Sequence, residues 1–197
     1  MSNTKTTDNR SYLFLANKDA DNIIAKSVGS DYHNFRDLWK KVSNHEIVLD
    51  FPPHLDIELN STCNYHCPFC TPHLRNVGKD IEYMDMTLFH KIINTGAKHG
   101  LKSLTLNWIN EPLLRNDIAN YVAYAKEHGM YDVMFNTNGE LLNKEIAKDL
   151  ILAGLTKLSV SLDAFSEESH KKHRPGGNFK IVIKNINKFL KIRNSMG

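Results

Sequence analysis

Cys63-Asn-Tyr-His-Cys67-Pro-Phe-Cys70 is the stretch that contains every cysteine of this 197-residue chain. A disulfide framework needs cysteines that are spread along the chain in pairs, so three thiols this close together do not suit one. Thiolates are soft ligands that favour iron–sulfur clusters, zinc or copper. Three thiolates on a [4Fe–4S] cluster would also leave one iron open to a further ligand. The stretch therefore predicts a metal or cluster site.

A zinc site is the alternative interpretation of the same cysteines, with His66 or His73 as the fourth ligand. Zinc ligands usually come as two close pairs that a longer loop separates. This sequence has one compact loop and no second pair. The spacing therefore favours a cluster, and we expect neither histidine to be a ligand.

The composition is that of a soluble globular protein, with 41% hydrophobic and 24% charged residues. A formal net charge of +3 is too small to indicate a nucleic-acid partner. No apolar stretch is as long as a membrane span, and the polar start from Met1 to Arg10 lacks the apolar centre of a secretory signal. We therefore expect a cytoplasmic protein with reduced thiols and no membrane partner.

Two parts of the chain differ in their patterns. Residues 1–50 form an N-terminal extension that is polar and irregular up to about Ser30, so we expect a loose lead there. One amphipathic helix follows from Asp31, because apolar residues recur at helical spacing at Tyr32, Phe35, Leu38, Trp39 and Val42. Residues 51–197 form the core, which begins at Pro52-Pro53.

The core alternates between strand-like and helix-like segments. The predicted strands are Leu55–Leu59, Ser103–Leu106, Tyr131–Phe135 and Leu158–Leu162. The predicted helices are Thr87–His99, Asp117–His128, Asn143–Ala153 and Phe179–Arg193. A glycine follows each of the first three helices, where it suits the left-handed conformation of a helix end. This alternation predicts an α/β fold with βαβ units and a parallel sheet.

Polar or metal-binding groups follow each predicted strand. The cysteines come after the first strand, Glu111 after the second, Asn136–Gly139 after the third and Ser161–Asp163 after the fourth. Parallel sheets carry their ligands at the carboxyl ends of the strands. We therefore expect these groups to gather at one edge of the sheet.

The order of these segments resembles the radical SAM superfamily. The matching residues are Cys63, Cys67, Phe69 and Cys70 in the cysteine motif, Asn110-Glu111-Pro112 at the family's Gly-Gly-Glu-Pro segment, Thr137-Asn138-Gly139, and Ser161-Leu-Asp163 at its Ser-x-Asp. The resemblance covers about Leu55 to Arg193. Several motifs in the right order are far more specific than the cysteines alone.

The resemblance implies a partial TIM-like (β/α) barrel, a [4Fe–4S] cluster held by Cys63, Cys67 and Cys70, and S-adenosylmethionine on the fourth iron. Members of this family reductively cleave S-adenosylmethionine to a 5′-deoxyadenosyl radical, which takes a hydrogen atom from a substrate. We expect the substrate to be a peptide, a protein or a sugar, and the electron donor to be a flavodoxin or ferredoxin. No catalytic residue is expected beyond the cluster, because the cofactors supply the chemistry.

The resemblance makes Glu111 the acceptor for the methionine ammonium, since a carboxylate matches a cationic donor. The chain departs from the family by carrying Ile109 and Asn110 in place of two glycines, which would let the backbone approach a ligand closely. Considered without the motif, Glu111 would be a solvated loop acid.

The remaining expected cofactor contacts also come from the resemblance. Ser161 and Asp163 are expected at the ribose hydroxyls or the methionine carboxylate, Phe69 near the adenine, and Asn138 along the cofactor cleft. Arg174 resembles an arginine that pairs with the methionine carboxylate. The residues alone permit other readings: a capping Asp163, a buried Phe69, an ordinary turn at Asn138 and a surface Arg174.

The chain supplies about four βα units, whereas the family barrel has six. We expect a fragment of a longer protein, with a split enzyme or pairing with another chain as alternatives, because an open fourth strand leaves an unpaired edge. Residues 159–189 resemble the branch that adds a SPASM domain, although no further cysteines are present. The alternative functions are a non-catalytic iron–sulfur or zinc module and a partner-dependent subunit.

Overall fold

The computed structural model describes residues 20–70 and 81–196, and the chain divides into two compact units, residues 1–49 and 50–197. In the first unit, helices α1 (Ala20–Val28) and α2 (Asp31–Ser43) pack on each other. The Tyr32 hydroxyl donates to the Asp21 carboxylate at 3.0 Å, and Arg36 Nε donates to the same group at 3.3 Å.

The helix predicted from Asp31 is confirmed, whereas the loose lead up to Ser30 is wrong from Ala20 onward. The α1 helix has only nine residues, a length at which an isolated helix is marginal in water. Ile24 is buried, and Asp21 binds Tyr32 of α2. Contacts between the two helices therefore stabilise this short segment.

The second unit is built on a four-stranded parallel sheet in the order β1-β2-β3-β4. The strands are β1 (His54–Asp56), β2 (Ser103–Thr105), β3 (Asp132–Thr137) and β4 (Lys157–Val160). Each strand pairs with the strand before it in the chain, and Leu55 lies opposite Leu104 in the first pair. The predicted α/β fold with four βα units is confirmed.

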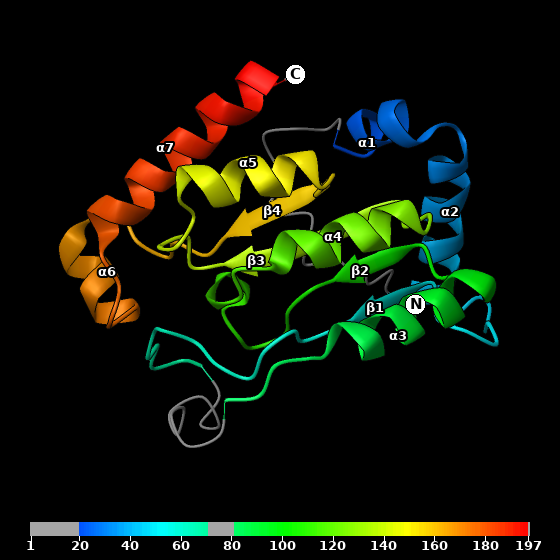
Figure 1. Ribbon diagram of the computed structural model, residues 1–197, viewed down its shortest axis with the longest axis horizontal. Coiled ribbons are helices and arrows are strands. Elements are labelled where there is room, and N and C mark those ends of the chain that lie inside the picture. The colour runs from blue at the N-terminus through cyan, green and yellow to red at the C-terminus, as the bar shows by residue number, and fades with distance from the viewer. Residues whose placement is uncertain (1–19, 71–80, 197) are drawn as a thin grey trace, which may run out of the picture. The chain divides into compact units, whose positions relative to one another are not determined.

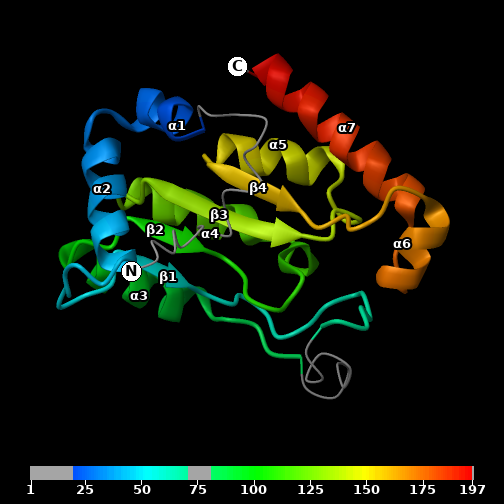
Figure 2. The ribbon, with the colours of Figure 1, turned by 180° about the vertical axis from the view of Figure 1, so that it is seen from behind.

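Three helices cover one face of this sheet: α3 (Met86–Lys98), α4 (Ile118–Glu127) and α5 (Lys144–Leu152). They lie in front of the strands in Figure 1 and behind them in Figure 2. The Asp85 carboxylate caps α3 by accepting from Thr87 N–H at 2.6 Å, and Asn143 caps α5. The glycines after these helices have positive φ, as predicted: Gly100, Gly129 and Gly154.

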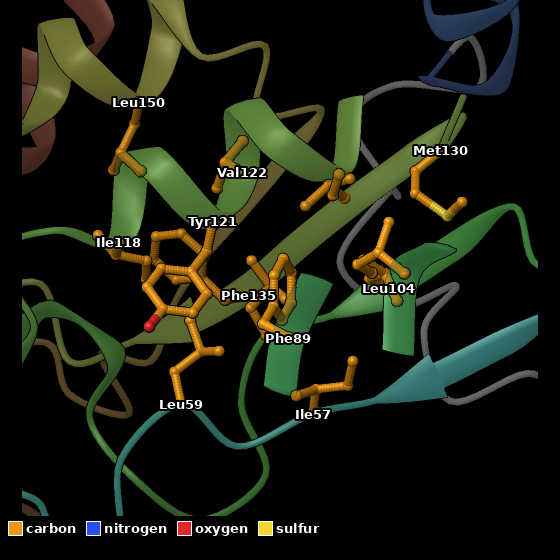
Figure 3. Close-up of a cluster of buried hydrophobic side chains, with 14 of the residues drawn as sticks. Ile57, Leu59, Phe89, Leu104, Ile118, Tyr121, Val122, Met130, Phe135 and Leu150 are labelled. Atoms are coloured by element: carbon orange, nitrogen blue, oxygen red, sulfur yellow. The ribbon is translucent and has the colours of Figure 1, made fainter. Parts of the chain in front are cut away.

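The core lies between these helices and the sheet. Figure 3 shows Phe89 of α3 and Tyr121 of α4 beside Phe135 of β3, and all three are essentially inaccessible to solvent. The rings of Phe89 and Tyr121 meet edge to face with centroids 4.9 Å apart. This packing fixes the strands, and with them the loops at their carboxyl ends.

Two helices follow β4: α6 (Glu167–His173) and α7 (Phe179–Met196). The α7 helix packs beside α5, as Figures 1 and 2 also show. The α6 helix was not predicted, although Ser166 and Ser169 form a capping box at its start. Within residues 20–70 and 81–196, no helix has both the length and the apolar character needed to cross a membrane.

Candidate functional site

The cysteines lie on a long loop, residues 60–83, which we call the cysteine loop; its residues 71–80 lie outside the described part. The base of the loop is closed by hydrogen bonds. Met84 N–H donates to the Leu59 carbonyl at 3.0 Å, Ser61 N–H donates to the Glu82 carbonyl at 3.0 Å, and Asn60 forms an antiparallel bridge with Tyr83. The loop therefore leaves and returns beside the end of β1.

A buried arginine clamps the same base. Arg115 Nη1 donates to the Leu59 carbonyl at 2.9 Å and to the Met84 carbonyl at 2.8 Å. Its other nitrogens bind the Asp117 carboxylate and, at 2.6 Å, the Tyr121 hydroxyl. Arg115 lies just after the short helix η3 (Pro112–Leu114) and joins the cysteine loop to the Glu111 segment. The sequence analysis missed it.

The three cysteines are close together, and none is in a disulfide. Cys67 is buried, whereas Cys63 and Cys70 are half-buried. Cys70 N–H donates to the Cys67 carbonyl at 3.0 Å, which makes a tight turn. Burial raises the pKa of the Cys63 thiol to about 11. It also raises the pKa of Cys67, which the nearby Arg174 guanidinium opposes.

The donor set of this loop suits a [4Fe–4S] cluster. Structural zinc ligands usually come as two close pairs, whereas this loop carries three cysteines in one compact run. A cluster takes one thiolate at each of three irons. His73 lies outside the described residues.

The cysteine loop packs against the segment after α6. His66 N–H donates to the Pro175 carbonyl at 3.0 Å. The Tyr65 ring lies so close to Gly177 that a side chain at that position would overlap it. Gly177 is therefore required for close approach rather than for an unusual backbone angle.

Gly177→Ala is expected to destabilise the protein by about 1–3 kcal/mol, because the added methyl group overpacks the contact with Tyr65. Urea unfolding followed by circular dichroism measures the change. Combining Gly177→Ala with Tyr65→Leu should recover part of the loss, since the smaller side chain makes room. A Gly177→Ala variant as stable as the wild type would contradict the tight contact.

Glu111 is buried, with 2% of its surface exposed, so the solvated-acid interpretation is wrong. Its carboxylate accepts from Thr137 Oγ1 at 2.7 Å, Asn138 N–H at 2.8 Å and Leu113 N–H at 3.1 Å. Burial raises the pKa of Glu111, and these hydrogen bonds oppose the rise. The loops after β2 and β3 are therefore joined at one carboxylate.

Asn138 connects this carboxylate to the cysteine loop. Its Nδ2 donates to Asn64 Oδ1 at 2.7 Å, and Asn64 Nδ2 donates to the Glu140 carboxylate at 3.1 Å. Asn185 of α7 donates to the carbonyls of Gly139 and Glu140 at 3.0 and 2.7 Å. The Asn138 segment is thus more than an ordinary turn. Asn64 and Glu140 were missed because their partners are distant in sequence.

Arg174 is buried, which rules out the surface-arginine interpretation. Its guanidinium binds the Asp163 carboxylate, and its Nη1 lies 3.9 Å from Cys67 Sγ. It also lies 5.6 Å from the centroid of the Phe69 ring. Phe69 is 61% exposed, so it is not a buried aromatic. Arg174 therefore holds three of the predicted positions together.

Ser161 and Asp163, the two residues expected after β4, contact different parts of the site. Ser161 N–H donates to the Thr137 carbonyl at 2.8 Å, which places Ser161 beside the Glu111 segment. Asp163 has a positive φ of 49° and binds Arg174. It does not cap α6, because Ser166 fills that position. The structure thus forms two groups, around Glu111 and around Arg174, and the cysteine loop contacts both.

A sequence model of the radical SAM superfamily matches residues 57–195. This chain belongs to the radical SAM superfamily. Members of this superfamily use a [4Fe–4S] cluster and S-adenosylmethionine. The match covers all three cysteines, Glu111 and Arg174, so the predicted family is confirmed.

Curated relatives carry the name of one radical SAM enzyme. A probable GTP 3′,8-cyclase of Methanococcus maripaludis is 32% identical over 136 residues, which are 69% of this chain and 45% of the relative. A probable GTP 3′,8-cyclase of Saccharolobus solfataricus is 35% identical over 132 residues, which are 67% of this chain and 42% of that protein. The chain thus spans less than half the length of these radical SAM relatives.

Solved structures show the same fold at low sequence identity. Native anSMEcpe with bound AdoMet superposes with a TM-score of 0.58 at 21% identity, covering 70% of this chain and 40% of that one. Methylornithine synthase (PylB) gives a TM-score of 0.53 at 16% identity, and the match covers 87% of this chain and 52% of that one. The sheet and helices of residues 50–197 therefore have the fold of part of a TIM-like barrel.

Proposed function

We propose that this chain holds a [4Fe–4S] cluster through Cys63, Cys67 and Cys70 and cleaves S-adenosylmethionine reductively beside it. One observation carries the proposal. Glu111 N–H donates to the Thr62 carbonyl at 2.8 Å, so a buried carboxylate is fixed to the residue that precedes the first cysteine. The Glu111 segment and the start of the cysteine motif are therefore joined directly.

The polar side chains of the site match the charged groups of S-adenosylmethionine. A carboxylate has about four lone-pair positions, and three donors already occupy Glu111. The remaining position suits the methionine ammonium. The Arg174 guanidinium binds the Asp163 carboxylate, and we propose that Arg174 also binds the methionine carboxylate and Asp163 the ribose hydroxyls. When bound, the cluster supplies the electron for cleavage of the sulfonium, and hydrogen abstraction from a substrate follows.

Electron paramagnetic resonance of the whole chain tests this function. The chain is reconstituted anaerobically with iron and sulfide, reduced, and measured with and without S-adenosylmethionine. We expect a [4Fe–4S]⁺ signal that changes when S-adenosylmethionine is added. A cluster signal that ignores it would favour the non-catalytic iron–sulfur module. Tightly bound zinc with no cluster would contradict the proposal outright.

Glu111→Gln is expected to retain the cluster but to weaken binding of S-adenosylmethionine by about 10-fold to 100-fold. The amide keeps the shape of the side chain but loses the charge that attracts the ammonium. Titration of the signal change with S-adenosylmethionine measures the affinity, and iron analysis measures the cluster. Glu127→Gln, at an exposed position at the end of α4, is the control for loss of a carboxylate. Equal affinities for wild type and Glu111→Gln would remove Glu111 from the site.

The substrate of the whole protein is a separate proposal. The names of the relatives favour a purine nucleoside triphosphate over the peptide, protein or sugar expected from the sequence. Deuterium transfer into 5′-deoxyadenosine from labelled GTP, peptide or sugar would distinguish these classes.

A flavodoxin or ferredoxin remains the proposed electron donor. The cytoplasm remains the proposed location, since the three cysteines are unpaired.

A further inference from the structure

Asn110 stands where related sequences were expected to have a glycine, and its side chain is buried, with 7% of its surface exposed. A buried amide is costly unless its donors and acceptor are satisfied. Asn110 Nδ2 donates to Asn60 Oδ1, and Asn110 Oδ1 accepts from Trp108 N–H at 3.3 Å. The departure from glycine therefore comes with a specific partner in the cysteine loop.

Asn60 carries the contact onward to Glu111. It is also buried, with 3% of its surface exposed. Its Nδ2 donates to the Glu111 carbonyl at 3.2 Å and to the Thr62 carbonyl at 3.4 Å. One side chain thus binds both the segment that carries Glu111 and the segment that leads into Cys63.

A third contact joins the same two segments. Ile109 N–H donates to the Glu58 carboxylate at 2.7 Å, and Glu111 N–H donates to the Thr62 carbonyl. Residues 58–62 therefore bind residues 109–111 along their whole length. Among these contacts, only the pair of Asn60 and Asn110 joins the segments from side chain to side chain, so substitutions at either residue remove it and leave both groups of the Glu111 N–H to Thr62 carbonyl bond in place.

We propose that Asn60 and Asn110 act together as positioning residues that hold Glu111 at a fixed place relative to the cluster ligands. The inference rests on the proposed function, because it concerns the binding of S-adenosylmethionine at Glu111. The contact between the two buried amides joins the segment before Cys63 to the segment that carries Glu111. Neither asparagine is a catalytic residue, and both act through Glu111.

The test compares wild type with Asn110→Gly, Asn60→Ala and the double variant, all with reconstituted cluster. Each single variant should retain its iron and raise the Kd for S-adenosylmethionine about tenfold, a usual cost of removing a supporting contact. The double variant should cost less than the two single effects multiplied, because the contact between Asn60 and Asn110 is lost in each single variant. Asn120→Ala, at an exposed position of α4, is the control for loss of an asparagine.

A second measurement does not use the cofactors. Hydrogen exchange of the chain without cluster should show faster exchange of the Ile109 and Glu111 N–H groups in Asn110→Gly than in wild type. The Phe135 N–H within β3 should be unchanged. The thermal unfolding midpoint of each variant is also measured. An unchanged midpoint would show that faster exchange reflects a local change around Glu111 and not unfolding of the protein. If Asn110→Gly is too unstable to measure, Asn60→Ala carries the same comparison.

The outcomes separate the two proposals. A wild-type cluster that responds to S-adenosylmethionine, with unchanged Kd in both single variants, would overturn the positioning role and leave the function intact. A double variant whose Kd for S-adenosylmethionine rises by the product of the two single increases would also overturn the positioning role, because the two residues would then act independently. A wild-type cluster that does not respond would overturn the proposed function, and the positioning role with it.

Discussion

Cys67→Ala is expected to abolish [4Fe–4S] binding, because the chain contains only three cysteines and none can replace the lost ligand. Cys67 is the buried member of the three and lies beside Arg174. Iron and sulfide analysis after anaerobic reconstitution should fall to background, and the visible absorption of the cluster should disappear. The change is an all-or-none effect rather than a reduction in affinity.

Two histidine variants serve as controls for that result. His66→Ala and His73→Ala should bind the cluster as well as wild type does, since we expect neither histidine to be a ligand. A zinc site with three cysteines and one histidine predicts the opposite, because one of these variants would then lose a metal ligand. Loss of iron in either histidine variant would contradict a cluster that the three cysteines hold by themselves.

Arg115→Met is expected to lower the free energy of unfolding of residues 50–197 by about 3 kcal/mol. The substitution leaves the Leu59 and Met84 carbonyls without their Arg115 donor. Both ends of the cysteine loop are then less firmly held, so the reconstituted chain should also lose its cluster faster in the presence of a chelator. Urea unfolding and the rate of cluster loss measure the two effects.

Two further arginine variants test whether the loss of stability comes from the hydrogen bonds of Arg115. Arg193→Met, on the exposed face of α7, should change the unfolding free energy by less than about 0.5 kcal/mol. The unfolding free energy of Arg115→Lys should lie between those of Arg115→Met and wild type, because one ammonium cannot form all the hydrogen bonds of a guanidinium. An Arg115→Met variant that matches Arg193→Met would show that the clamp contributes little.

The sequence predicted most of the fold because its periodicity was strong. The helices around Phe89, Tyr121 and Leu150 carry buried residues at helical spacing, and glycines mark their ends. The α1 and α6 helices were missed for a physical reason. The first has nine residues and packs on α2, and the second has seven residues, most of them polar, so both are too short to show an apolar repeat over several turns.

The sequence predicted the groups at the strand ends but not what holds them in place. Cys63 and Glu111 follow their strands, as expected. Asn60, Asn64 and Arg115 look like ordinary loop residues in the sequence, because each binds a group far away along the chain. Asn60 and Arg115 are buried and Asn64 is half-buried, and burial of a loop residue depends on tertiary packing that local patterns do not contain.

The order of the strands in the sheet equals their order along the chain. During synthesis on the ribosome, the N-terminal segments emerge first. Each new strand can therefore pair with a strand that has already folded, without waiting for a later segment to fill a gap between them. Each later strand pairs with the strand that was synthesised just before it, so the sheet can form in the order of translation.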